Sequence, residues 1–147
     1  MRFRALWTLT VILAMQGRAL CQTDASVDLV RKYLVARNAT MQIDATAQDI
    51  EKTLEFCSDD IVYEHPAAKA RIEGKNKLQA GMASYLGLTR DARYKVEILA
   101  SNRDVVIATV SRNFLSRQED GSWVKGERSN ITVFEIESGK IRRILDY

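Results

Sequence analysis

The chain has 147 residues, of which 46% are hydrophobic and 28% charged, with one histidine and two cysteines. This length predicts one compact domain that buries about two thirds of the surface of its unfolded chain. Two cysteines are few: Cys21 could pair with Cys57 if the mature chain begins after Ala19, whereas Cys57 is alone if it begins after Cys21. A single histidine without a paired-cysteine motif leaves too few ligands for a zinc site, and we expect neither a metal nor a cofactor.

Residues 1–21 are typical of a secretory signal peptide. Two arginines precede an apolar stretch, Ala5 to Met15, and small residues follow near two candidate cleavage points, Ala19 and Cys21. The stretch is too short to span a bilayer comfortably. A buried first helix is the alternative, but the stretch shows no polar face. We therefore expect a secreted or periplasmic protein in which residues 22–147 form a single domain.

Charge also narrows the choice of partners. Three of the 22 basic residues lie in the predicted signal peptide, so basic and acidic side chains balance at 19 each in the rest of the chain. A neutral surface gives no electrostatic reason to bind nucleic acid or an anionic bilayer. We expect no nucleic-acid partner and, after signal cleavage, no membrane partner.

After the signal peptide the pattern predicts two helices. Ser26 is predicted to cap the first, whose apolar residues recur at helical spacing with Tyr33 beside them. Thr46 and Asp49 resemble the capping box that starts the second helix. Cys57 is predicted to be a small buried hydrophobe on the apolar face of that helix.

The segment from Asp59 to Pro66 contains the only histidine and the only proline of the chain. Proline keeps its predecessor extended, so His65 is predicted to end a short strand. Alternation then places Ile61, Tyr63 and His65 on one face, with the imidazole facing the helices. Asp59 and Asp60 are predicted to cap or turn the chain before that strand.

The rest of the chain predicts a third helix and then strands. After a polar turn over residues 69–74, a helix extends from about Leu78 to Leu86, with Gly87 at its end. The apolar period then changes to two and predicts strands over residues 94–100, 105–117, 123–136 and 141–147, with a hairpin at Asp120-Gly121. This order is typical of an α+β fold in which a sheet curls over the helices and leaves a cavity between them.

The order of the elements, the strand that ends in His-Pro and the final Gly-Lys-Ile-x-x-x-x-Asp-Tyr segment resemble the nuclear transport factor 2-like superfamily. Within it, the chain most resembles SnoaL-like polyketide cyclases, ketosteroid isomerases and limonene epoxide hydrolases, over residues 26–147. The resemblance implies a cone-shaped, curved antiparallel sheet wrapped around three N-terminal helices in the order α-α-β-α-β-β-β-β. The superfamily includes enzymes, ligand carriers and dimerisation modules, so the fold alone does not choose among them.

The resemblance also implies catalytic residues. In ketosteroid isomerases the corresponding strand ends in Asp-Pro, and that Asp is the general base. His65 stands there in this chain, and an imidazole moves protons readily near neutral pH. Tyr33 fits the oxyanion-donating tyrosine of the first helix, and Asn130, or Ile131 with a shift of one residue, fits the second donor. With Asp146 of the final segment, these side chains form the expected catalytic set.

Epoxide hydrolases of the superfamily use an Asp-Arg-Asp set. Asp146 matches the last Asp and Arg112 matches the Arg, but Phe114 stands two residues on from Arg112 where a carboxylate would be needed. Epoxide hydrolysis is therefore the less favoured reaction. The expected pocket lining is Tyr63, Arg112, Phe114 and Tyr85.

Each of these residues also has a structural interpretation. His65 can be a hydrogen-bonded pocket wall, Tyr33 a core aromatic residue, and Asp146 the partner of neighbouring arginines. The expected function is that of an exported protein with a pocket for a small apolar molecule and isomerase- or cyclase-type acid–base chemistry, in which His65 is the base. The alternative is a non-catalytic ligand-binding or homodimerisation domain on the same fold, and a homodimer is expected in either case.

Overall fold

The structure, a computed structural model, describes residues 25–147, and the predicted signal peptide lies outside them. The first helix covers residues 25–39. The other elements are the helices α2 (Ala47–Leu54) and α3 (Lys75–Ala83), a 3-10 turn (Pro66–Ala68), and the strands β1 (Cys57–His65), β2 (Ala70–Glu73), β3 (Thr89–Ser101), β4 (Val105–Arg117), β5 (Trp123–Glu137) and β6 (Lys140–Asp146). The predicted α+β class and element order are confirmed.

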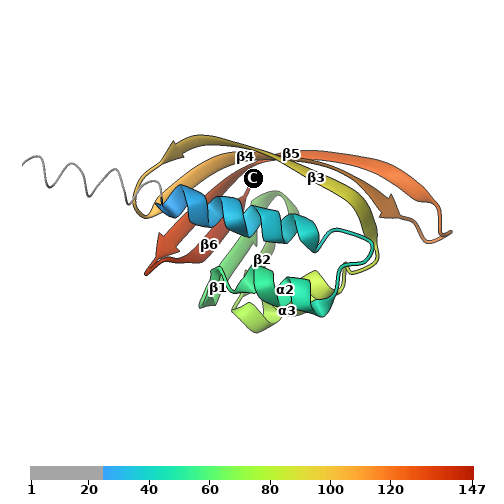
Figure 1. The fold of residues 1–147 in the computed structure, drawn as a ribbon, viewed down its shortest axis with the longest axis horizontal. Helices are drawn as coiled ribbons and strands as arrows, with labels where there is room; N and C mark the ends of the chain where they lie inside the picture. The colour runs from blue at the N-terminus through green and yellow to red at the C-terminus, as the bar shows by residue number, and fades with distance from the viewer. Residues whose placement is uncertain (1–24) are drawn as a thin grey trace, which may run out of the picture.

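Six strands form one curved sheet in the order β2-β1-β6-β5-β4-β3. Neighbours are antiparallel except for β1 and β6, which pair in parallel with Tyr63 opposite Ile144. The last strand therefore lies in the middle of the sheet, where it joins the strand that ends in His65 to the long meander. Figure 1 shows the sheet arching over the first helix, with α2 and α3 below that helix.

The core lies between the arch and the helices. Alternate residues of β4 and β5 turn inward, and Val106, Ala108 and Phe134 are almost completely buried. We call this side of the sheet the inner face, and the opposite side the outer face. From the first helix, the Tyr33 ring meets the Phe134 ring edge to face, with 6.0 Å between the ring centroids. This packing fixes the helix against the middle of the inner face.

Two predictions about the helices need correction. Ser26 does not cap the first helix, because residue 25 is already helical, and the Ser26 hydroxyl instead donates to the carbonyl oxygen of Arg103 at 2.6 Å. Cys57 is buried as expected, but it begins β1 and is not part of α2. Burial of a single residue does not distinguish a helix from a strand, and here the pairing of Cys57 with Ile141 decides for the strand. The capping box of α2 is confirmed, since the Asp49 carboxylate accepts from the Thr46 backbone N–H at 2.9 Å.

The segment around the strand that ends in His65 also differs from the prediction. Asp59 and Asp60 lie within β1, where they form ion pairs with Lys75 and Arg142. The predicted polar turn over residues 69–74 contains β2, whose four residues pair with the end of β1. Lys69 makes this possible by adopting a left-handed conformation with φ of 52°.

The third helix has the predicted length but lies three residues earlier, from Lys75 to Ala83. It ends at Ala83, so Tyr85 and Leu86 lie in the turn that follows. Gly87 has φ of 73°, the left-handed conformation expected for glycine after a helix, but it lies four residues beyond the last helical residue.

Candidate functional site

Five polar side chains from four strands face the same end of the inner face. They are Tyr63 and His65 near the end of β1, Arg112 on β4, Thr132 on β5 and Asp146 at the end of β6. Strand register brings them together, since Thr132 pairs with Asp146 and the end of β1 runs beside the end of β6. We call these five residues the polar cluster.

Asp146 is at the centre of the polar cluster. It is only 8% exposed, and burying a carboxylate is costly unless hydrogen bonds and a counter-charge compensate it. Its two oxygens accept from the Thr132 hydroxyl at 2.9 Å and from the Tyr63 hydroxyl at 3.3 Å. The nearest guanidinium nitrogen of Arg112 lies 4.0 Å from Asp146 Oδ2. Asp146 is therefore held in one position by three groups.

Tyr63 is a hydroxyl donor at neutral pH. Burial, and then the negative charge of Asp146, raise the pKa of Tyr63 to about 12, while Arg112 and Arg37 act in the opposite direction. The phenol therefore stays protonated and donates its hydrogen to the carboxylate.

His65 is oriented by the backbone of β6. Its Nδ1 lies 2.6 Å from the carbonyl oxygen of Asp146. Because a carbonyl oxygen can only accept, Nδ1 must carry the proton and donate it. In the neutral imidazole this leaves Nε2 as the unprotonated nitrogen, which is the form a general base requires.

Tyr33 approaches from the first helix and is 6% exposed. Burial raises the pKa of its hydroxyl well above the usual range, with a further increase from Cys57. The positive charge of Arg37, one helical turn later, lowers the pKa of both Tyr33 and Tyr63. Tyr33 is thus a neutral phenol whose hydroxyl can donate a hydrogen bond.

The remaining predicted residues are spread more widely. Asn130 is half-buried on the inner face opposite Val110, whereas the alternative, Ile131, points to the outer face and is 49% exposed. Phe114 also lies on the inner face, with its ring against Gly126, where an added Cβ would come within 2.6 Å of the ring. Tyr85 lies outside the polar cluster, in the turn after α3, and is 59% exposed.

The sequence analysis missed four residues in or near the polar cluster: Thr132, Arg37, Tyr94 and Arg128. Thr132 is two residues from Asn130 and Arg128 two residues before it, so strand alternation predicts the same face for all three. Arg37 follows Tyr33 by one helical turn, a spacing that also predicts a shared face. The hydroxyl oxygen of Tyr94 is buried, and no hydrogen-bond partner for it occurs within residues 25–147.

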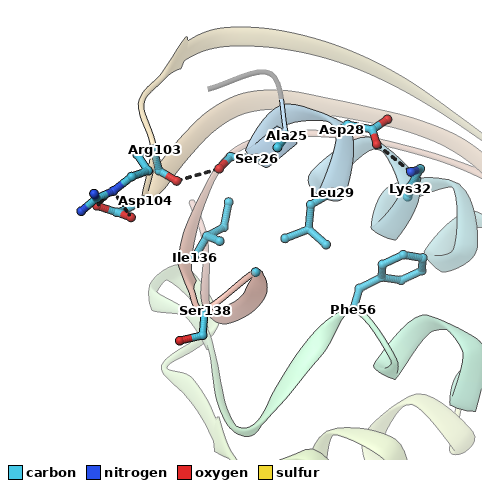
Figure 2. A pocket seen from close by; sticks show the side chains of 11 residues that line it. Ala25, Ser26, Asp28, Leu29, Lys32, Phe56, Arg103, Asp104, Ile136 and Ser138 are labelled. Atoms are coloured by element: carbon cyan, nitrogen blue, oxygen red, sulfur yellow. Dashed lines mark hydrogen bonds and ion pairs between the residues drawn. The ribbon is translucent and has the colours of Figure 1, made fainter. Parts of the chain in front are cut away.

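A cleft of about 650 Å³ opens at the other end of the sheet, near the start of the first helix. Figure 2 shows Leu29, Phe56 and Ile136 at its apolar centre. The four charged side chains that line it form two pairs with each other, Asp28 with Lys32 at 2.6 Å and Arg103 with Asp104 at 3.1 Å. None of the predicted catalytic residues lines this cleft. Its charges are already satisfied, so the polar cluster is the better candidate for chemistry.

Within residues 25–147, no group of three metal-ligating side chains comes together. No helix in the same part of the chain is both long enough and apolar enough to cross a membrane.

Comparison with known proteins agrees with this architecture. The sequence profile of the SnoaL-like domain matches residues 30–144. A search of curated proteins finds no match to the chain.

Several solved structures share the fold. A candidate polyketide cyclase from Xanthomonas campestris pv. campestris superposes with a TM-score of 0.70 at 16% sequence identity, over 86% of this chain and 91% of that one. An LEH-like epoxide hydrolase from M. tuberculosis gives 0.66 at 19% identity, over 85% and 83% of the two chains. A candidate ketosteroid isomerase from Kribbella flavida gives 0.60 at 22% identity, over 84% and 77%. At these identities the likeness concerns the fold and leaves the reaction open.

Proposed function

The chain belongs to the SnoaL-like domain family, and from that premise we propose that it is an acid–base enzyme that moves a proton on a small apolar carbonyl compound, with His65 as the base. The observation that carries the proposal is the hydrogen bond from His65 Nδ1 to the Asp146 carbonyl oxygen, at 2.6 Å. In the neutral imidazole this bond selects the tautomer in which Nε2 is free to accept a proton, and it orients the ring. A candidate polyketide cyclase and a candidate ketosteroid isomerase among the structural neighbours are consistent with this class of reaction.

In the proposed reaction, His65 Nε2 takes a proton from a carbon next to the substrate carbonyl. The electron pair of that C–H bond forms an enolate, and the negative charge develops on the carbonyl oxygen. The hydroxyl of Tyr33 and the amide of Asn130 are the proposed donors to that oxygen. In an isomerase the imidazolium returns the proton to another carbon. In a cyclase the enolate carbon attacks a second carbonyl of the same substrate, and the alkoxide that forms there takes the proton from the imidazolium.

Asp146 has a positioning role in this proposal. Its backbone carbonyl orients His65, and its carboxylate is fixed by Thr132 and Tyr63. The same backbone carbonyl can accept from Nδ1 of the imidazolium that forms when the base takes a proton. Epoxide hydrolysis is less well supported, because Phe114 stands where the second acid would be needed and, within residues 25–147, Asp146 is the one carboxylate that pairs with Arg112.

The test uses His65→Asn, because the Asn amide can keep the donor to the Asp146 carbonyl while the base is lost. A panel of β,γ-unsaturated ketones is incubated with the protein, and formation of the conjugated enone is followed by absorbance. General-base removal should lower kcat by about 100-fold or more. Arg103→Gln, at the far cleft, is the control and should keep full turnover.

Two outcomes would overturn the proposal. The first is turnover by His65→Asn at the rate of the unmodified protein. The second is thermal protection by these ketones without any turnover, which would support the alternative of a non-catalytic ligand-binding domain.

We also propose that the protein acts after export, as the composition of residues 1–21 suggests.

A further proposal is that two copies of the protein associate through the outer face of the sheet. In support of association, strand register aligns Ile107, Val133 and Leu145 in one apolar row across that face. Ile131, beside this row, is 49% exposed. Sedimentation analysis should show a dimer that Ile131→Lys converts to a monomer, whereas a monomeric unmodified protein would refute the association.

A further inference from the structure

We propose that the substrate carries a carboxylate, held by Arg112 and Arg128 beside the polar cluster, so that its chemical class is a small apolar oxo acid. This inference rests on the proposed function for the reacting end of the molecule. It adds a second recognition element for the charged end.

Arg112 and Arg128 are direct cross-strand neighbours. The register of β4 and β5 runs without interruption and places the two residues opposite each other. Both belong to the inner face by alternation with Val110 and Thr132, although Arg112 is partly buried and Arg128 is exposed. Like charges directly opposite each other destabilise a sheet. An anion bound between them would remove that repulsion.

The protein itself provides little negative charge here. The Asp146 carboxylate lies 4.0 Å from Arg112, and its oxygens already accept hydrogen bonds from Thr132 and Tyr63. Within residues 25–147, Arg128 forms no ion pair, and neither does Arg37. Arg112 is mostly removed from solvent, with its side chain 21% exposed, so its field is less screened than that of a surface residue.

Tyr94 provides an independent indication of a ligand. It lies opposite Arg112 on the neighbouring strand β3, which places Tyr94, Arg112 and Arg128 in one row. Its hydroxyl oxygen is buried, and no partner for it occurs within residues 25–147. Buried polar groups are nearly always hydrogen-bonded in folded proteins. A carboxylate in this row would accept from the phenol as well as from the guanidinium groups.

The neighbouring row of the inner face explains why the rest of the ligand should be apolar. Val96, Val110 and Asn130 follow one another across β3, β4 and β5. An acid anchored at the arginines therefore extends over two valines and one amide toward Thr132 and Asp146. A carboxylate also matches a guanidinium in shape, since two coplanar oxygens can accept two parallel N–H bonds.

The probes are 2-naphthoate and its uncharged methyl ester, titrated by calorimetry at low salt. The unmodified protein should bind the acid at least about tenfold more tightly than the ester, since a hydrogen bond to a charged group is worth about that factor or more. His65 is the only histidine of the sequence, so its imidazole NMR signals should shift when the acid binds at this place.

The variants assign the preference to the two arginines. Arg128→Gln should lower the acid-to-ester preference about threefold, and Arg112→Gln with Arg128→Gln should remove it, with ester affinity kept in both. Arg93→Gln is the matched control. It removes the same charge as the other variants, but Arg93 lies on the outer face, opposite Asn113. It should leave the preference unchanged.

Three results would overturn the inference. The protein could bind acid and ester with equal affinity, the double variant could keep the preference for the acid, or neither probe could bind at millimolar concentration. An acid preference that leaves the His65 signals unmoved would place the anion elsewhere and would also overturn it. Failure of the proposed function is separate. A carboxylate preference without turnover of any ketone would refute the enzyme and keep the anion site, whereas turnover without a preference would do the reverse.

Discussion

The hydrogen bond from Thr132 to Asp146 allows a quantitative test of the polar cluster. Thr132→Val keeps the β-branched shape and removes only the hydroxyl that donates to the carboxylate at 2.9 Å. Asp146 is buried, so the lost donor is not readily replaced by water. A hydrogen bond to a charged group contributes roughly 1.5–3 kcal/mol. We therefore expect the free energy of unfolding at pH 7 to fall by about 2 kcal/mol.

The assay is denaturant unfolding, followed by circular dichroism and analysed as a two-state transition. Thr109→Val is the matched control, because Thr109 faces outward on the neighbouring strand and is only half-buried. It should change the free energy of unfolding by no more than about 0.5 kcal/mol. In an Asp146→Asn background the acceptor is neutral, so Thr132→Val should cost only about 1 kcal/mol.

Two results would refute this account of the polar cluster. One is a Thr132→Val protein within about 0.5 kcal/mol of the unmodified chain. The other is the same loss with and without the Asp146 charge, since the cycle would then show no coupling between the two residues.

Two further predictions concern packing and titration. Gly126→Ala would place a methyl group 2.6 Å from the Phe114 ring, so the ring must move; we expect a loss of about 1–2 kcal/mol in denaturant unfolding, and unchanged stability would contradict this contact. Burial raises the pKa of both Cys57 and Tyr63 to about 12. The folded state therefore favours the neutral thiol and the neutral phenol. This contribution to stability is complete below the unfolded thiol pKa of about 8.5 and is lost as the pH rises through about 12. Cys57→Ala should therefore reduce the fall in unfolding free energy between about pH 9 and 11, and an equally steep fall in that variant would show that the thiol does not contribute.

Local sequence signals predicted much of the architecture. The bounds of β4 and the Asp120-Gly121 hairpin follow from period-two alternation and turn chemistry, and both are observed. The capping box of Thr46 and Asp49 is a contact between residues three apart, which sequence spacing describes well. The strand that ends in His65 was predicted for a similar reason, since proline restricts the residue before it.

Other features depended on contacts between distant segments. Cys57 could continue α2 or begin a strand, and its pairing with Ile141 decides the matter. The four residues of β2 carry no apolar pattern long enough to predict a strand, and they form one because Lys69 reverses the chain beside His65. The parallel pairing of β1 with β6 joins residues about 80 positions apart, as in the bond from His65 to the Asp146 backbone.

For the candidate site, the residues that could take part were predictable from the sequence. Its one histidine ends a predicted strand, and Tyr33, Asn130 and Asp146 stand where the resembling enzymes carry catalytic groups. Which of these side chains meet depends on the folded arrangement of the strands. That arrangement placed Thr132, Tyr63 and Arg112 around Asp146, turned Ile131 outward and left Tyr85 in an exposed turn. The physical reason is register: strand alternation fixes the face that each side chain occupies, but pairing between strands far apart in the chain fixes its neighbours across the sheet.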